Sequence, residues 1–382
     1  MKKVKCVLFA SMIILIFLIG CNNKGKKVTH VGKVNLSSSI KIDSTVIDVS
    51  YTSGRGNFYM IDSLITFADA YSFTLYSYNN NTGKLISKHF RKGHGPNELN
   101  SFMYVYPDSK SHKIFILDSS YFLSSCDSSF NLVKKGVIDF GWKNNMHHSS
   151  DFNTPRNYKI MEMSDFDMNL TYINDSILMI PVNVIHRKTS QNGFVNSKEY
   201  DEGHIFGLLN LNSMKVKKVL GKYPYIYKTN PVPHMDFFQY SMKEDTIYVN
   251  HAIDSLIYVY KYPDKLLYTF GYECNNINRN YTVTKKVDHG KLLKNDTKKC
   301  GMNIGLKYIS QTNLLLRTYM LNLNNGESGL QIYKDNNLIG DFKMPRYFKL
   351  LGYCDKYYYG VRLIPIETRD ITKFVFYKFK IQ

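Results

Sequence analysis

One shape recurs along most of this sequence: an apolar strand, a short turn rich in Asn, Asp, Gly or Ser, and a second strand. Five copies lie at 73–90, 113–138, 205–220, 255–271 and 329–344, and the chain ends with the strand "FVFYKFKI". Short apolar runs separated by such turns are typical of antiparallel β-hairpins. The abundance of 31 Tyr and 23 Phe residues also favours strands. The repeat therefore predicts an all-β fold built from similar hairpins.

The spacing of the hairpin turns is typical of a β-propeller. Leu85 and Leu132 are 47 residues apart, and Val216 and Leu266 are 50 residues apart. Propeller repeats run from roughly 40 to 50 residues. The five hairpins, with the C-terminal strand counted as part of a sixth, predict six blades, each a four-stranded antiparallel sheet that is buried against its two neighbours.

Wider gaps between some hairpins predict insertions, at about 141–169 with 186–204 and at about 275–303. With these insertions, a single propeller domain accounts for residues 37–382. The segment "SSIKIDSTVIDVS" also alternates like a strand. We expect it to lie in the same blade as the C-terminal strand or in a neighbouring blade, because ring closure removes two exposed sheet edges.

The N-terminus, "MKKVKCVLFASMIILIFLIGC", has the pattern of an export signal. Lysines precede an apolar run at 6–19, which is short for a membrane span and typical of a signal peptide. Residues 18–21 match a lipobox, whose cysteine is acylated and becomes the mature N-terminus. We expect a signal peptide at 1–20, a lipidated Cys21 and a flexible tether at 21–36. The alternative is an ordinary secretory signal with a chance cysteine.

The tether and the overall charge limit the location and the partners. No acidic residue precedes Asp43, whereas acidic residues after the cysteine are typical of some surface-export signals. We therefore expect a protein of the cell envelope, lipid-anchored to the bacterial (outer) membrane and facing the periplasm. The formal net charge is +19, but the lysines are scattered, so nucleic acid is not an expected partner. A glycan, a peptide or an envelope protein remains as the expected kind of partner.

Four cysteines remain if Cys6 is removed and Cys21 is lipidated. None of them forms a C-x-x-C pair, so neither a zinc ribbon nor a thioredoxin-like site is indicated. Export permits disulfides, and four cysteines allow three pairings. Cys274 and Cys300 bracket one predicted insertion, which makes them the first candidates for a disulfide. The alternative is four buried thiols.

The stretch "FRKGHGPNELN" follows the first hairpin. Gly93 and Gly95 can adopt positive φ, and Pro96 fixes φ near −65°. Together they predict a structural turn between two blades, with Glu98 capping backbone N–H groups that the turn leaves unpaired. The alternative is a ligand or catalytic loop in which His94 acts with Glu98.

The lipobox, the hairpins and this turn together resemble the TolB-like six-bladed propeller lipoproteins and, more loosely, the NHL-type propellers. In that group a G-x-G-P-x-E/G-[FL] segment follows a first "LYxYDxxTGK" hairpin. Here "GHGPNEL" follows "LYSYNNNTGK", and the resemblance covers about residues 35–382. It implies a propeller on a lipid anchor and implies no activity.

No recognisable catalytic motif is present: there is no G-x-S-x-G elbow, no H-E-x-x-H and no Walker loop. No cofactor or metal is indicated either. We therefore expect a binding or interaction module rather than an enzyme. The alternative is a hydrolase or lactonase-like propeller with a metal in its central channel. A channel lined by Ser, Tyr and Lys would favour binding, and a ring of Asp, Asn, Glu or His would favour the enzyme.

Overall fold

The computed structural model describes most of the chain from Ile40 onward. The described residues are 26–27, 39–93, 95, 97–99, 101–102, 104–108, 111–142, 151–161, 169–185, 197–286, 290–362 and 373–382. The predicted signal peptide and Cys21, the predicted site of lipidation, lie outside the described residues, as do His94 and Pro96.

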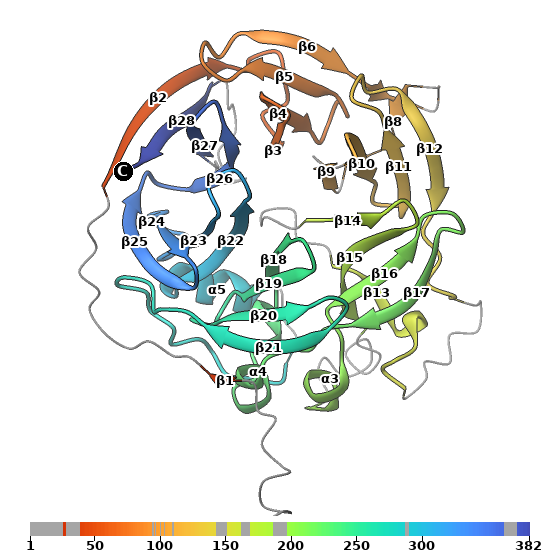
Figure 1. Ribbon diagram of the computed structural model, residues 1–382, viewed down its shortest axis with the longest axis vertical. Helices are drawn as coiled ribbons and strands as arrows, with labels where there is room; N and C mark the ends of the chain where they lie inside the picture. The colour runs from red at the N-terminus through yellow and green to blue at the C-terminus, as the bar shows by residue number, and fades with distance from the viewer. Residues whose placement is uncertain are drawn as a thin grey trace, which may run out of the picture.

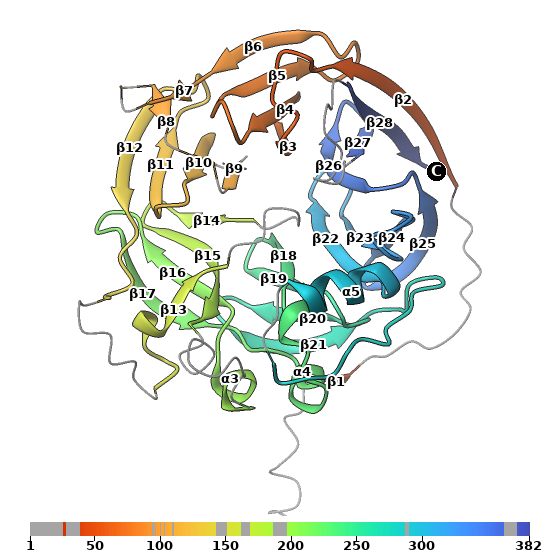
Figure 2. The same ribbon diagram turned by 180° about the vertical axis from the view of Figure 1, so that it is seen from behind.

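Six antiparallel sheets surround one axis as the blades of a propeller (Figures 1 and 2). Blade 1 contains β3 (Gly56–Ile61), β4 (Leu64–Asp69), β5 (Leu75–Asn79) and β6 (Leu85–His89). Blade 2 contains β9 (Tyr104–Asp108), β10 (Lys113–Leu117), β11 (Phe122–Cys126) and β12 (Leu132–Val137). Blade 3 contains β13 (Tyr158–Ile160), β14 (Thr171–Asn174), β15 (Ile177–Val184), β16 (Phe206–Asn210) and β17 (Lys215–Leu220).

The second half of the chain forms the other three blades. Blade 4 contains β18 (Phe238–Lys243), β19 (Thr246–His251), β20 (Ile257–Lys261) and β21 (Lys265–Phe270), and the short β1 (Lys26–Lys27) lies parallel to β21. Blade 5 contains β22 (Met302–Ile309), β23 (Leu314–Met320), β24 (Ser328–Lys334) and β25 (Asn337–Met344). Blade 6 contains β26 (Phe348–Cys354), β27 (Tyr357–Arg362), β28 (Lys373–Ile381) and β2 (Ile40–Asp48). The six-bladed architecture expected from the hairpin repeat is confirmed.

The two ends of the chain meet in blade 6. β2 forms the outermost strand of that blade and pairs antiparallel with β28, from Ile40 opposite Ile381 to Asp48 opposite Lys373. The expected closure of the ring is thus confirmed. Each end depends on the other, because removing either strand leaves an unpaired sheet edge.

The fold is mostly β rather than entirely β. Three short helices are present among the described residues, namely α3 (Ser197–Glu202), α4 (Tyr225–Thr229) and α5 (Lys291–Lys299), with 3₁₀ turns η1 (Pro155–Asn157) and η2 (Pro233–Met235). α3, α5 and η1 fall inside the predicted insertions. Between β17 and β18, α4 follows Pro224 and η2 begins at Pro233. Figure 2 shows α5 on the face turned towards the viewer. Within the described part of the chain, no helix is long and apolar enough to span a membrane.

Aromatic side chains fill the spaces between neighbouring blades. Phe58 of blade 1 contacts Phe374 of blade 6 with ring centroids 4.6 Å apart. Phe206 of blade 3 contacts Tyr240 of blade 4 at 4.8 Å. Edge-to-face pairs of this kind stabilise packing beyond the area that they bury, and they account for the use of so many Tyr and Phe residues.

One charged side chain is part of this packing. Arg317 of blade 5 is fully buried. Its guanidinium donates to Gln331 Oε1 at 2.9 Å within its own blade and to the backbone oxygen of Ser255 in blade 4 at 2.7 Å. It also donates to the backbone oxygen of Tyr272 and to the Tyr333 hydroxyl. The buried charge therefore joins blades 4 and 5 through a set of satisfied hydrogen bonds.

Candidate functional site

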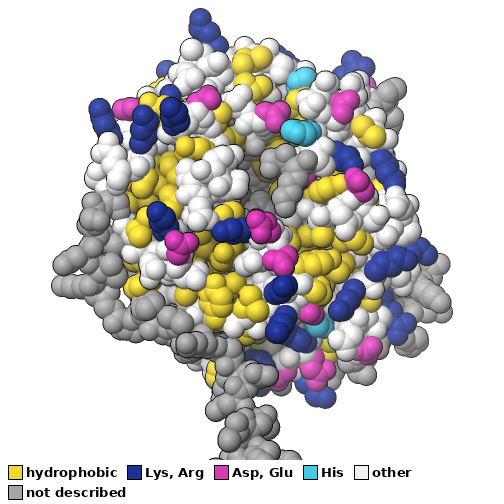
Figure 3. Space-filling view, viewed as in Figure 1, with side chains coloured by type: hydrophobic (Ala, Val, Ile, Leu, Met, Phe, Trp, Pro, Cys, Tyr) yellow, Lys and Arg dark blue, Asp and Glu magenta, His cyan; other side chains and the backbone are white. Residues whose placement is uncertain are grey.

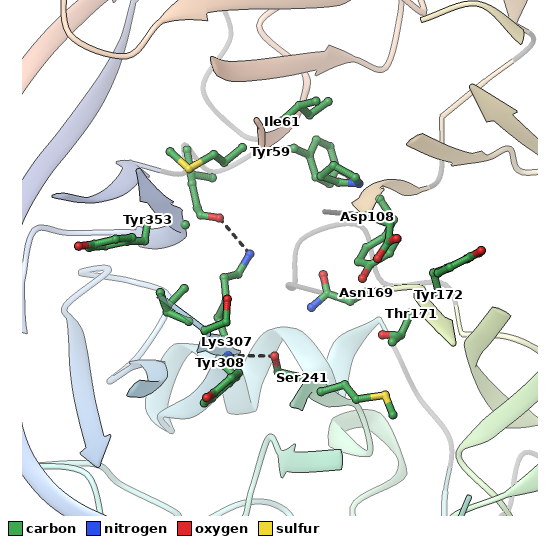
Figure 4. A pocket seen from close by; sticks show the side chains of 18 of the residues that line it. Tyr59, Ile61, Asp108, Asn169, Thr171, Tyr172, Ser241, Lys307, Tyr308 and Tyr353 are labelled. Carbon is green, nitrogen blue, oxygen red and sulfur yellow. Dashed lines mark hydrogen bonds between the residues drawn. The ribbon is translucent and has the colours of Figure 1, made fainter. Parts of the chain in front are cut away.

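A pocket of about 530 Å³ lies on the propeller axis. The innermost strands of all six blades line it, together with the turns that follow several of them. The face in Figure 3 is hollowed at its centre, and Figure 4 shows the side chains around the pocket from close by. Because the strand ends line it, the pocket occupies one end of the central channel.

Each blade contributes one tyrosine to the lining. These residues are Tyr59, Tyr106, Tyr172, Tyr240, Tyr308 and Tyr353. The first three occupy the same place in their strands, two residues before the last residue of β3, β9 and β14. In Figure 4 the hydroxyl groups of Tyr172 and Tyr353 point away from the axis. These two rings therefore form part of the pocket's rim.

A three-residue clamp joins blades 2 and 3 at this rim. Lys113 Nζ lies 5.4 Å from the ring centroid of Tyr172 and 3.3 Å from Asp175 Oδ1. The Tyr172 hydroxyl donates to the same carboxylate oxygen. Burial, followed by this hydrogen bond, raises the pKa of Tyr172 to about 12. The hydrogen bonds from Tyr172 and Lys113 lower the pKa of Asp175.

The same arrangement joins blades 4 and 5. Lys243 Nζ lies 5.2 Å from the ring centroid of Tyr308 and donates to Asn313 Oδ1 at 2.8 Å. The Tyr308 hydroxyl donates to that oxygen at 2.7 Å. In both clamps an ammonium group lies over a Tyr ring, and both groups share one acceptor oxygen. The lysine charges at the rim are therefore held by protein partners.

Nearer the axis, polar groups bridge neighbouring blades. The backbone N–H of Tyr308 donates to Ser241 Oγ at 2.9 Å, linking blades 5 and 4. Lys307 Nζ donates to the backbone oxygen of Leu351 in blade 6 at 3.1 Å. Asn169 Nδ2, just before blade 3's innermost strand, donates to the backbone oxygen of Tyr240 at 3.3 Å. Figure 4 shows Ser241, Lys307 and Asn169 around the middle of the pocket. Their positions are fixed by these bonds.

The charges of the described lining are nearly balanced. The lysines are Lys113, Lys243, Lys307 and Lys349, and the carboxylates are Asp62, Asp108 and Glu244. Lys349 is buried, with Nζ 5.6 Å from the ring centroid of Tyr59 across the junction of blades 6 and 1. Asp108 Oδ2 accepts hydrogen bonds from the Ser111 backbone N–H and hydroxyl, both at 2.6 Å. Among the described residues, no three His, Cys, Asp or Glu side chains lie together as a metal site would require.

The segment expected to turn between blades 1 and 2 joins β6 to β9 and includes the short strands β7 (Arg91–Lys92) and β8 (Glu98–Leu99). Glu98 Oε2 accepts the Gly95 backbone N–H at 2.7 Å, and Arg91 Nε donates to Glu98 Oε1 at 2.7 Å. Gly93 has a φ of +153°, whereas Gly95 has no positive φ. Leu99 is buried among side chains of both blades. None of the described residues of this segment lines the axial pocket.

Cys274 and Cys300, the first candidates for a disulfide, are buried free thiols in this structure. Cys274 Sγ donates to Asn303 Oδ1 at 3.6 Å, and Cys300 Sγ donates to the backbone oxygen of Asn280 at 3.2 Å. Since the two thiols have different partners, the disulfide is absent from this structure. Burial raises the pKa of both thiols to about 11. Cys126 and Cys354 are free as well.

Fold and pocket together define a six-bladed β-propeller with a polar pocket on its axis. No family model matches the sequence, and no curated protein matches it. The fold is similar to that of a member of the DUF4221 family from Bacteroides vulgatus, with a TM-score of 0.67 and 13% identity over 92% of this chain and 99% of that chain. It is also similar to a "Putative exported protein" from Bacteroides fragilis, with a TM-score of 0.51 and 13% identity over 94% of this chain and 99% of that one. At these identities, the likeness concerns the fold.

Proposed function

We propose that this protein is an extracytoplasmic, membrane-anchored binding module that holds its ligand in the axial pocket. The pocket carries this proposal, because all six blades contribute to it and its polar groups are already oriented by contacts between blades. Its volume falls within the range of about 300 to 1,000 Å³ that is usual for small-molecule sites. A rigid, preformed site of this kind favours binding because little ordering is needed when the ligand enters.

The chemistry of the lining favours binding over hydrolysis. Six Tyr, four Lys and three Ser residues belong to the lining, and Lys243 and Lys307 are held by neighbouring blades. Asp108 is engaged by its own turn through Ser111. A metal-dependent hydrolase or lactonase-like propeller, the alternative from the sequence, needs polar side chains that converge on one ion. The described lining offers no such convergence.

The location follows from the N-terminal pattern. The lipobox at residues 18–21 and the polar tether support export followed by acylation of Cys21, and one similar structure carries a name that describes it as exported. We also propose that the protein faces the periplasm and that it is similar to the TolB-like six-bladed propeller lipoproteins. The test of the anchor is palmitate labelling of the full-length chain. Label is expected in the parent and absent from Cys21→Ser; label that persists in the variant would overturn the anchor.

The test of the pocket is a melting-temperature screen with a blocking variant. Gln311 lies in an exposed turn at the mouth, so Gln311→Trp should obstruct entry without disturbing the core. Asn212 lies in an exposed outer turn of blade 3, and Asn212→Trp is the matched control. The screen would contain sugars, dipeptides and small carboxylic acids.

We expect at least one compound to raise the melting temperature of the parent and of Asn212→Trp but not that of Gln311→Trp. Equal shifts in all three proteins would place binding elsewhere. A screen without any stabilising compound would contradict binding in the pocket.

A further inference from the structure

We infer that the ligand of the axial pocket is an uncharged, polyhydroxylated compound, namely a glycan segment. This inference rests on the proposed function and adds the chemical class of the ligand. Three features of the pocket support it: the kind of polar groups near the axis, the way the lysine charges are held, and the aromatic rim.

The polar groups near the axis can both donate and accept hydrogen bonds. Ser241 Oγ accepts the Tyr308 N–H and still carries its own O–H donor. Asn169 uses one amide N–H on the Tyr240 backbone oxygen, and its side-chain oxygen is an acceptor. Thr171 adds a hydroxyl to the same wall. A sugar hydroxyl also donates and accepts, whereas an anion requires only donors and a cation only acceptors. This lining therefore matches hydroxyl groups better than it matches a charge.

The lysines of the lining do not converge as an anion site would require. Lys113 and Lys243 each lie over a Tyr ring and bind an oxygen of the next blade. Lys307 donates to the Leu351 backbone oxygen. Lys349 is buried against the ring of Tyr59. These amines lie at four different blade junctions. Their charges therefore stabilise contacts between blades and do not converge on one point in the pocket.

The rim supplies apolar surface for a sugar ring. Every blade places a tyrosine in the lining. Lysines lie over the rings of Tyr59, Tyr172 and Tyr308, and Tyr240 is fully buried. Tyr106 and Tyr353 are therefore the lining tyrosines that can offer a flat apolar area to the C–H face of a pyranose. A peptide of extended backbone would instead need a sheet edge or a groove, and the pocket is bounded by strand ends on all sides.

Isothermal titration calorimetry tests the class of ligand directly. The full-length protein would be purified in a detergent without a sugar headgroup. The neutral probes are maltose, cellobiose and N,N′-diacetylchitobiose; the charged probes are digalacturonic acid and dilysine. The variants are Asn169→Ala and Gln311→Trp, with Asn212→Ala as the matched control in an exposed turn.

We expect heat from at least one neutral disaccharide and none from the charged probes. Asn169→Ala should weaken that binding about fivefold to tenfold, as loss of one hydrogen bond does. Gln311→Trp should abolish it, and Asn212→Ala should leave it unchanged. If only a charged probe binds, and Gln311→Trp abolishes that binding, the pocket is a site but the class is wrong. If no probe binds, the inference fails; if a sugar binds equally to Gln311→Trp, both the inference and the proposed function fail.

Discussion

Lys243 of blade 4 reaches across to blade 5, where its Nζ donates to Asn313 Oδ1 at 2.8 Å over the ring of Tyr308. Lys113 and Asp175 repeat this relationship between blades 2 and 3. The two clamps differ chiefly in their acceptor, an amide in one and a carboxylate in the other. The same kind of clamp therefore joins neighbouring blades at two junctions of the pocket mouth. The charge of the acceptor determines how each clamp responds to pH.

Asp175→Asn should cost stability at neutral pH and little at acid pH. The pKa of Asp175 is lowered in the folded protein by the hydrogen bonds from Tyr172 and Lys113. A carboxyl group whose pKa is lowered on folding stabilises the protein at pH values above its unfolded pKa, which is about 3.8. This stabilisation is lost as the pH falls through the lower pKa of the folded protein. Melting temperatures of parent and variant would be compared at pH 7 and pH 3. Asn313→Ala, at the uncharged clamp, is the control and should give the same difference at both pH values. An unchanged difference for Asp175→Asn would refute the ion pair's role.

Arg317→Met should strongly destabilise the protein. The guanidinium is fully buried, and the variant would leave its acceptors on Gln331 and Ser255 unpaired. Leaving a buried acceptor without its donor costs about 1–3 kcal/mol for each group. Chemical denaturation measures the loss. Arg346→Met, at an exposed position, should stay within about 0.5 kcal/mol of the parent, and a similar small cost at Arg317 would contradict the account.

Deleting residues 374–382 should abolish the cooperative melt of the whole domain. The deletion removes almost all of β28, which pairs with β27 on one side and with β2 on the other. β2 would then lose the strand with which it pairs, and the ring would open at blade 6. Val46→Thr keeps the backbone pairs at an exposed position of β2 and is the control. A truncated chain with the parent's calorimetric transition would rule out interdependent ends.

Gly93→Ala should destabilise the protein more than Gly95→Ala. Gly93 has a φ of +153°, and a Cβ there would lie 2.0 Å from Glu98 Oε2. At Gly95 the corresponding distance is 3.0 Å, and φ is not positive. Strained backbone positions cost about 1–3 kcal/mol, so we expect a loss of that size for Gly93→Ala in urea denaturation. Equal losses at the two glycines would contradict this geometry.

The fold was predictable because its signals are local. Alternating strands and polar turns are visible in the sequence one hairpin at a time, and their spacing gives the blades. The sequence does not distinguish which glycine of "GHGPNEL" takes positive φ, and in the structure it is Gly93 rather than Gly95. It also does not show that Cys274 and Cys300 have different partners, because two cysteines that bracket an insertion need not lie close together.

The pocket was harder to predict because it forms only when the ring closes. Its lining comes from strand ends distributed along the chain, from Tyr59 to Tyr353. A weak sequence signal exists: Tyr59 and Tyr172 each lie three residues before an Asp, at Asp62 and Asp175. That spacing marks a strand end followed by a turn, and its meaning becomes clear only when the blades are placed around one axis.

A crystal structure of the protein with a disaccharide that raises its melting temperature tests the central claim most directly. We predict density for the sugar in the axial pocket, within hydrogen-bonding distance of Ser241 and Asn169. Density for the sugar elsewhere on the propeller, with the axial pocket free of it, would contradict the account.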